Sequence, residues 1–239
     1  MASSADVFRH LDRVKNVCYS ALTPNLKGYE AAKNANVDEV AIFTAASERF
    51  TQKNINCSID ESIARFTPLI EQAKHDMLRV RAYVSCIIGC PYEGNTAVEK
   101  VVQVTERLLA LGCYEVSLGD TIGVGTPSQI KSLLSSLKNQ FSIEHLACHF
   151  HDTYGQALAN QFAALELGYR TFDTSVAGLG GCPYATGASG NVSTEDTVYM
   201  LQGAGMETSI DLRKLIKAGN IICQAIGRKN QSKVALALA

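Results

Sequence analysis

The chain has 239 residues and a formal net charge of −1, with 46% hydrophobic and 19% charged residues. This composition is typical of a globular protein and excludes extensive disorder. The near-neutral charge argues against binding to nucleic acid or to a membrane surface, because both usually require an excess of basic residues. No apolar run approaches the roughly 18 residues of a membrane-spanning helix. The length predicts one domain, residues 1–239.

Short apolar segments alternate with helical patterns along the chain. A helical pattern at 5–15 comes first, and strands are predicted at 17–22, 39–45, 78–86, 114–119, 145–151 and 171–177. Helices are predicted at 25–35, 59–75, 96–111, 127–140, 156–167, 192–204 and 211–228. Such alternation predicts an α/β fold with parallel strands and helices packed outside them. The six strand–helix units leave two architectures open, an open doubly wound sheet and a TIM (β/α)₈-type barrel that lacks its first strands.

Several residues mark the ends of these helices. Ser58 is a plausible N-cap for the helix at 59–75. The run Thr96-Ala97-Val98-Glu99 has the form of a capping box. Gly112 and Gly168 follow helical runs, where a left-handed residue often ends a helix.

The chain contains eight cysteines, which is too sparse for a small disulfide-stapled domain. Cys86 and Cys148 lie in apolar, strand-like runs, where a cysteine packs as a small hydrophobic side chain. Cys86 and Cys90 are four residues apart, but no second closely spaced pair completes a zinc site. The cysteines therefore favour a reducing compartment.

Two histidines follow the predicted strand at 145–151. His149 and His151 are two residues apart, so both imidazoles should project from the same face at the strand's C-terminal end. In parallel α/β folds that end carries the active site. Two imidazoles there could bind a divalent metal ion, although two hydrogen-bonded polar side chains at a strand end would give the same pattern.

A glycine-rich loop spans residues 178–191 and follows the last predicted strand. Such loops can approach a ligand closely, and this one contains Cys182, a candidate acid or base. Asn191 ends the loop and has two possible roles, because it could cap the next helix or contribute an amide oxygen to a metal site.

A third group lies at the ends of two other strands. Ser117 and Asp120 fall at the C-terminal end of the strand at 114–119, and Tyr83 and Ser85 share one face of the strand at 78–86. The glycines that follow Asp120 have the wrong spacing for a dinucleotide fingerprint, and a tight turn explains them better.

Long motifs in the chain resemble the hydroxymethylglutaryl-CoA lyases of the DRE-TIM metallolyase superfamily. The similar stretches are LTPNLKG, NINCSIDES, YVSCIIGCPYEG, GCYEVSLGDTIGVGTP, HFHDTYGQALAN and VAGLGGCPYATGASGNVSTEDTVYML. The resemblance extends from about residue 20 onward and implies a metal-dependent (β/α)₈ barrel. The Cys-Pro-Tyr run at 182–184 separates these lyases from the related acyl-CoA/2-oxo acid condensing synthases.

The resemblance also implies roles for individual residues. His149, His151 and Asn191 match metal ligands, and Cys182 matches a loop cysteine that takes part in proton transfer. His149 and Asp120 match catalytic residues, Tyr83 and Ser117 match positions near the substrate, and Glu195 matches a residue that supports the metal ligands. The expected cofactor is Mg²⁺ or Mn²⁺.

The activity that the resemblance implies is a retro-Claisen cleavage. 3-Hydroxy-3-methylglutaryl-CoA would be split into acetyl-CoA and acetoacetate, a step of ketone body formation and leucine degradation. The expected partner is therefore a small acyl-CoA substrate. A homodimer is expected if the barrel is complete, and the family implies the mitochondrial matrix, with the cytoplasm as the alternative.

One family motif does not occur in the sequence. Members carry a Gly-x-Arg-Asp-Gly motif on their first strand, where the Asp is a metal ligand and the Arg stabilises an oxyanion, and these 239 residues contain no such motif. We therefore expect about six βα units, with the first two strands missing. Because loss of one oxyanion donor alone can cost about 10²–10³ in rate, this chain by itself is expected to be inactive or impaired, as a fragment or short isoform would be.

Overall fold

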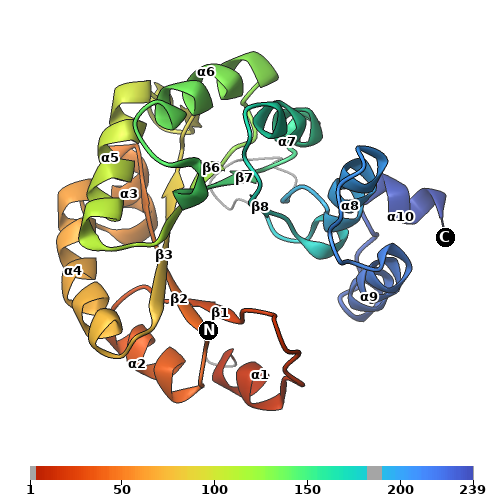
Figure 1. The fold of residues 1–239 in the computed structure, drawn as a ribbon, viewed down its shortest axis with the longest axis horizontal. Helices are drawn as coiled ribbons and strands as arrows, with labels where there is room; N and C mark the ends of the chain where they lie inside the picture. Colours follow the sequence, from red (N-terminus) through yellow and green to blue (C-terminus); the bar gives the residue numbers. More distant parts are fainter. Residues whose placement is uncertain (1–3, 182–189, 239) are drawn as a thin grey trace.

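The computed structural model describes residues 4–181 and 190–238, and it is built on a parallel sheet of six strands. The strands lie in the order β1-β2-β3-β6-β7-β8, and every neighbouring pair is parallel. The sheet curves into an incomplete barrel (Figure 1). Its strands are β1 (Ser20–Leu22), β2 (Glu39–Ala45), β3 (Arg79–Ser85), β6 (Glu115–Asp120), β7 (Leu146–Phe150) and β8 (Phe172–Asp173).

Helices follow the strands and cover the convex side of the sheet (Figure 1). This layer contains α2 (Leu26–Asn34), α4 (Ile59–His75), α5 (Val98–Leu111), α6 (Pro127–Lys138) and α7 (Ala157–Glu166). The helix α1 (Ser4–His10) lies near β1, and α8 (Thr194–Gly203), α9 (Leu212–Ala225) and α10 (Lys233–Ala237) gather beyond β8. The predicted α/β fold with six parallel strands is confirmed, and it has the shape of an incomplete TIM-type barrel.

Besides the C-terminal helix α10 and the 3₁₀ turns at 143–145 and 176–178, two parts of the fold were not predicted. The helix α3 (Glu48–Ile55) follows β2 directly, with Ser47 as its N-cap and Asn56 in the left-handed conformation at its end. A short hairpin of β4 (Gly89–Cys90) and β5 (Gly94–Asn95) follows β3. Both elements are short and lie inside segments that periodicity assigned to connections, so their sequences carried little signal.

The helix ends are partly as predicted. Ser58 caps α4 in a full capping box with Glu61, and Gly112 ends α5 with φ of 107°. The capping box predicted at Thr96 is wrong, because the N-cap of α5 is Ala97, whose methyl side chain cannot accept a hydrogen bond. The last predicted helix, 211–228, ends earlier at Ala225, close to Gly227 with its φ of 65°.

The hydrophobic core lies between the sheet and its outer helices. Strand residues such as Val84 and Leu118 are fully buried there, together with Phe66 and Leu69 from α4. Full burial of one such side chain contributes about 1.5–3 kcal/mol. Because residues alternate along a strand, the other face of the same strands turns toward the inside of the barrel.

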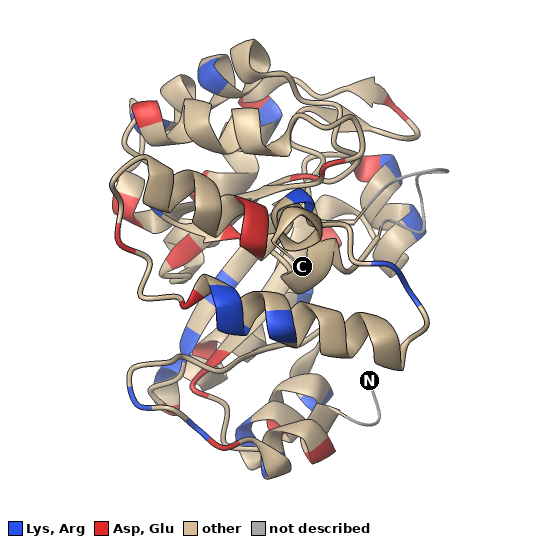
Figure 2. Cartoon of the chain, turned by 90° about the vertical axis from the view of Figure 1, so that its right-hand side faces the viewer, with Lys and Arg blue, Asp and Glu red and all other residues tan. Residues whose placement is uncertain are grey.

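The outer surface is mixed in charge. Figure 2 shows acidic and basic residues interspersed on the side of the molecule that carries α8, α9 and α10. None of the helices in the described ranges is long and apolar enough to cross a membrane.

Candidate active site

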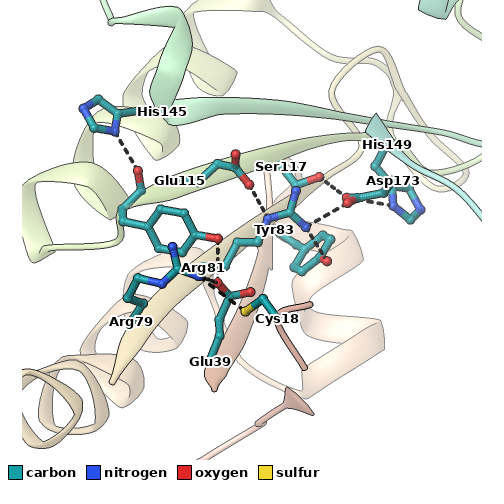
Figure 3. A network of polar contacts seen from close by, with 11 residues as sticks. Cys18, Glu39, Arg79, Arg81, Tyr83, Glu115, Ser117, His145, His149 and Asp173 are labelled. Atoms are coloured by element: carbon teal, nitrogen blue, oxygen red, sulfur yellow. Dashed lines mark hydrogen bonds and ion pairs between the residues drawn. The ribbon is translucent and has the colours of Figure 1, made fainter. Parts of the chain in front are cut away.

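Polar side chains occupy the inner face of the curved sheet. Arg81 and Tyr83 come from β3, and Glu115 and Ser117 come from β6. The strand register places Arg81 opposite Glu115 and Tyr83 opposite Ser117. These side chains point toward one another in Figure 3. The inner face therefore carries a network of polar side chains rather than an apolar barrel core.

Arg81 lies at the centre of this polar network. Its Nε donates to Glu115 Oε1 at 2.5 Å, and its Nη1 donates to the hydroxyl of Tyr83 at 2.6 Å and to Asp173 Oδ1 at 2.8 Å. Arg81 is only 7% exposed. A buried guanidinium is tolerated here because two carboxylates neutralise its charge.

Asp173 connects this network to the first histidine (Figure 3). Its Oδ2 accepts a hydrogen bond from Ser117 Oγ at 2.5 Å and lies 3.4 Å from His149 Nδ1. Burial alone would raise the pKa of Asp173, but the hydrogen bond with His149 and the charge of Arg81 lower that pKa below its ordinary value. Asp173 is therefore an anion beside His149.

The two predicted histidines lie together, as expected from their spacing. The ring centroids of His149 and His151 are 5.3 Å apart. Burial, and then the neighbouring His149, lower the pKa of His151 to about 4. His151 is therefore neutral at physiological pH, which is the form that binds metal ions. Its Nδ1 is buried and has no hydrogen-bond partner among the described residues.

Asn191 approaches the histidines from the far end of the glycine-rich loop. Its backbone forms an isolated antiparallel bridge with His151. Its Nδ2 donates to the carbonyl of Leu179 at 2.9 Å, whereas its buried Oδ1 has no partner within the described ranges. The N-cap of α8 is Ser193, so Asn191 does not have the alternative role of capping that helix.

These donors fit a divalent cation. Within residues 4–181 and 190–238, no group of three His, Cys, Asp or Glu side chains is placed to hold a metal ion. The candidate ligands are instead the imidazoles of His149 and His151 and the amide oxygen of Asn191. Two of the candidate ligand atoms, His151 Nδ1 and Asn191 Oδ1, are buried and have no hydrogen-bond partner in those ranges. Mixed nitrogen and oxygen ligands of this kind suit Mn²⁺, and the oxygen donor also suits Mg²⁺.

Asp120 lies at the end of β6 but turns toward the loop that follows it. Its Oδ2 accepts a hydrogen bond from the backbone N–H of Gly125 at 2.8 Å. Gly125 is required there, because a Cβ at that position would lie 2.9 Å from Asp120 Oδ2. Burial raises the pKa of Asp120 to about 6, and its Oδ1 has no partner within the described part of the chain. A carboxyl group with this pKa can exchange a proton near neutral pH.

Glu195 contacts the base of the glycine-rich loop, and among the described residues it forms no hydrogen bond with a histidine. Its side chain is fully buried, and both carboxylate oxygens accept from the backbone N–H of Ala177, at 3.0 and 2.9 Å. Ala177 has a φ of 56°, an unfavourable value for a residue with a side chain. The hydrogen bonds from Ala177 to Glu195 help to hold this conformation.

The two ends of the loop meet at a narrow neck, formed by residues 178–180 and 190–191. A Cβ on Gly190 would lie 2.4 Å from the carbonyl oxygen of Gly178 and 2.5 Å from that of Gly180. Only glycine fits at position 190. Residues 178–180 and residue 190 are therefore in close backbone contact.

Known proteins are similar in sequence to nearly the whole chain. A sequence profile described as HMGL-like matches residues 3–222. The chain belongs to the HMGL-like family. The bovine "Hydroxymethylglutaryl-CoA lyase, mitochondrial" is 56% identical over 99% of this chain and 73% of its own length. The mouse "3-hydroxy-3-methylglutaryl-CoA lyase, cytoplasmic" is 53% identical over 99% of this chain and 69% of its own length.

A solved HMGL-like structure has nearly the same backbone. The hydroxymethylglutaryl-CoA lyase from Pseudomonas aeruginosa aligns with a TM-score of 0.97 and 52% identity, covering 100% of this chain and 79% of the other. This similarity supports the incomplete TIM-type barrel described above.

The polar network includes three residues that sequence reasoning missed, Arg81, Glu115 and Asp173. Arg81 lies inside β3 between the apolar residues Val80 and Ala82, and a charged residue at such a position was a usable signal. Asp173 is the second residue of the two-residue strand β8 and gave no pattern of its own. Among the predicted residues, Cys182 lies outside the described residues.

Proposed function

We propose that this chain carries the activity of a hydroxymethylglutaryl-CoA lyase, a carbon–carbon lyase that cleaves 3-hydroxy-3-methylglutaryl-CoA to acetyl-CoA and acetoacetate. The observation that carries the proposal is the 56% identity to the bovine lyase over 99% of the chain. His149, Asp120 and Asp173 lie at the C-terminal ends of parallel strands, which is where an enzyme of this architecture binds its substrate.

In this proposal, His149, His151 and Asn191 hold a divalent cation, Mg²⁺ or Mn²⁺. Such a cation, when bound, supplies positive charge that lowers the pKa of an adjacent hydroxyl group. The neutral state of His151 supports its role as a ligand, because it needs to lose no proton first. The buried and unpartnered Oδ1 of Asn191 supports the third position.

The other predicted residues are assigned proposed roles beside these ligands. Tyr83 packs the edge of its ring against His149, with ring centroids 6.1 Å apart, and would limit where a ligand sits. Ser117 offers a hydroxyl on the same inner face. Asp120 and Cys182 are proposed to exchange protons with the substrate and product. Glu195 is proposed to support the site indirectly, through the loop neck.

The test is acetoacetate release from 3-hydroxy-3-methylglutaryl-CoA by the purified chain with Mg²⁺ or Mn²⁺. A second arm adds the part of the bovine relative that lies outside the match, where the Arg-Asp motif is expected, because the match spans 73% of that protein. We expect slow or no turnover by the chain alone, faster turnover with the added segment, and loss of both in His149→Ala. Turnover in neither arm, or turnover that a chelator leaves unchanged, would refute the proposal.

The assembly and compartment are also proposed. We expect a homodimer once the barrel is complete, which light scattering of the chain with the added segment measures. We propose the mitochondrial matrix from the name of the bovine relative, although the mouse relative is cytoplasmic. Cell fractionation with an antibody to this chain distinguishes the two compartments.

A further inference from the structure

Asp173 is held beside His149 by the strand register. β8 pairs with β7 so that Asp173 lies directly opposite His149. The Oδ2 of Asp173 is 3.4 Å from the Nδ1 of His149, and the two side chains are 20% and 25% exposed. Both are largely withdrawn from solvent, so this contact is only weakly screened.

Two further donors fix the orientation of the Asp173 carboxylate (Figure 3). Arg81 Nη1 binds Oδ1 at 2.8 Å, and Ser117 Oγ binds Oδ2 at 2.5 Å. Arg81 is itself held by Glu115 and by the hydroxyl of Tyr83. Rotation of the carboxylate would break at least one of these contacts. It is therefore a rigid acceptor aimed at one nitrogen of His149.

A histidine that ligates a metal ion through one nitrogen usually donates its other N–H to a fixed acceptor. We infer that Asp173 is a positioning residue for His149: it accepts the Nδ1–H and so leaves the Nε2 lone pair to bind the divalent cation. This inference rests on the proposed function, because it requires His149 to be a metal ligand. Arg81 and Ser117 act one step further out, since they orient Asp173.

The inference has a measurable size. Removing an outer partner of a metal-ligating histidine typically weakens metal affinity about 10–100-fold. We expect a loss of this size in Asp173→Asn, which keeps the volume of the side chain but removes its charge. Asp60→Asn is the matched control, because Asp60 is 80% exposed and pairs with Arg107 on the outer surface.

The first test measures Mn²⁺ affinity by titration, following the electron paramagnetic resonance signal of free Mn²⁺. We expect about 10–100-fold weaker binding in Asp173→Asn and wild-type binding in Asp60→Asn. Wild-type affinity in Asp173→Asn would overturn the inference. By contrast, wild-type affinity in His149→Ala would overturn the proposed metal site itself, so the two failures are distinguishable.

The second test reads the protonation of the ring directly. In ¹⁵N NMR spectra of the Mg²⁺-loaded chain, we expect His149 to carry its proton on Nδ1, and Asp173→Asn to lose this preference. An unchanged tautomer in the variant would overturn the inference. If Asp173→Asn does not fold, Ser117→Ala removes one donor to Asp173 and is expected to weaken Mn²⁺ binding several-fold, and unaltered binding there would also overturn it.

Discussion

Replacing Gly219 by alanine tests the packing that supports the loop neck. Gly219 lies within α9, where a Gly→Ala change ordinarily stabilises a helix by about 1 kcal/mol. Here the new Cβ would lie 2.5 Å from Glu195 Oε1 and 3.2 Å from Asn230 Nδ2. Glu195 can move away only by giving up its hydrogen bonds from Ala177, because its side chain is fully buried.

The magnitudes decide the sign of the effect. A hydrogen bond to a buried charged group is worth about 1.5–3 kcal/mol, which exceeds the gain of about 1 kcal/mol in helix propensity. With the close contact to Asn230, we expect Gly219→Ala to destabilise the chain by about 1–2 kcal/mol. For a chain of this size, that lowers Tm by about 2–8 °C.

Urea unfolding followed by circular dichroism measures the change. Gly203→Ala is the matched control, because a Cβ at position 203 meets no atom within 4 Å, and we expect this variant to be as stable as wild type or slightly more stable. In a Glu195→Ala background the close contact with the carboxylate is gone, so Gly219→Ala should there become neutral or stabilising. A Gly219→Ala single variant more stable than wild type would refute the reasoning.

Three further predictions concern α2 and α4. Tyr29→Phe removes the hydrogen bond, 2.6 Å long, that the hydroxyl of the fully buried Tyr29 donates to Asp76. We expect the free energy of unfolding, measured in urea, to fall by about 1–1.5 kcal/mol, and an unchanged value would contradict this. Hydrogen bonds from Lys33 and Tyr29 hold the pKa of Asp76 well below its ordinary value. The ionised Asp76 carboxylate therefore stabilises the folded chain fully above its unfolded-state pKa of about 4, and this contribution is lost as the pH falls through the folded-state pKa. Asp76→Asn should therefore flatten the decline of Tm between pH 5 and pH 2, and an unchanged decline would contradict this. Leu69→Ala leaves a cavity at a fully buried site and should lower the free energy of unfolding by about 2–5 kcal/mol. Glu71→Ala, at an exposed position of the same helix, should change it by less than about 0.5 kcal/mol. Similar effects of the two variants would contradict the burial pattern.

Sequence patterns predicted the parts of the molecule that local rules govern. The six strands were visible as apolar runs, and the two-residue spacing was enough to expect His149 and His151 on one face. Other features depend on contacts between distant segments. Asp173 reaches His149 only because β8 pairs with β7 in one register. Glu195 contacts Ala177 only because α8 folds back against the loop base. Neither contact produces a periodic pattern in the sequence from which it could be predicted.

The narrow neck at residues 178–180 and 190–191 has a consequence for how this protein can diverge. A Cβ at position 190 would meet the carbonyl oxygens of Gly178 and Gly180, so any substitution there must first move the backbone on the other side of the neck. Backbone atoms cannot give way as cheaply as the end of a flexible side chain can. Position 190 can therefore change only together with residues 178–180, and the neck links the divergence of two stretches of chain that are separated in sequence.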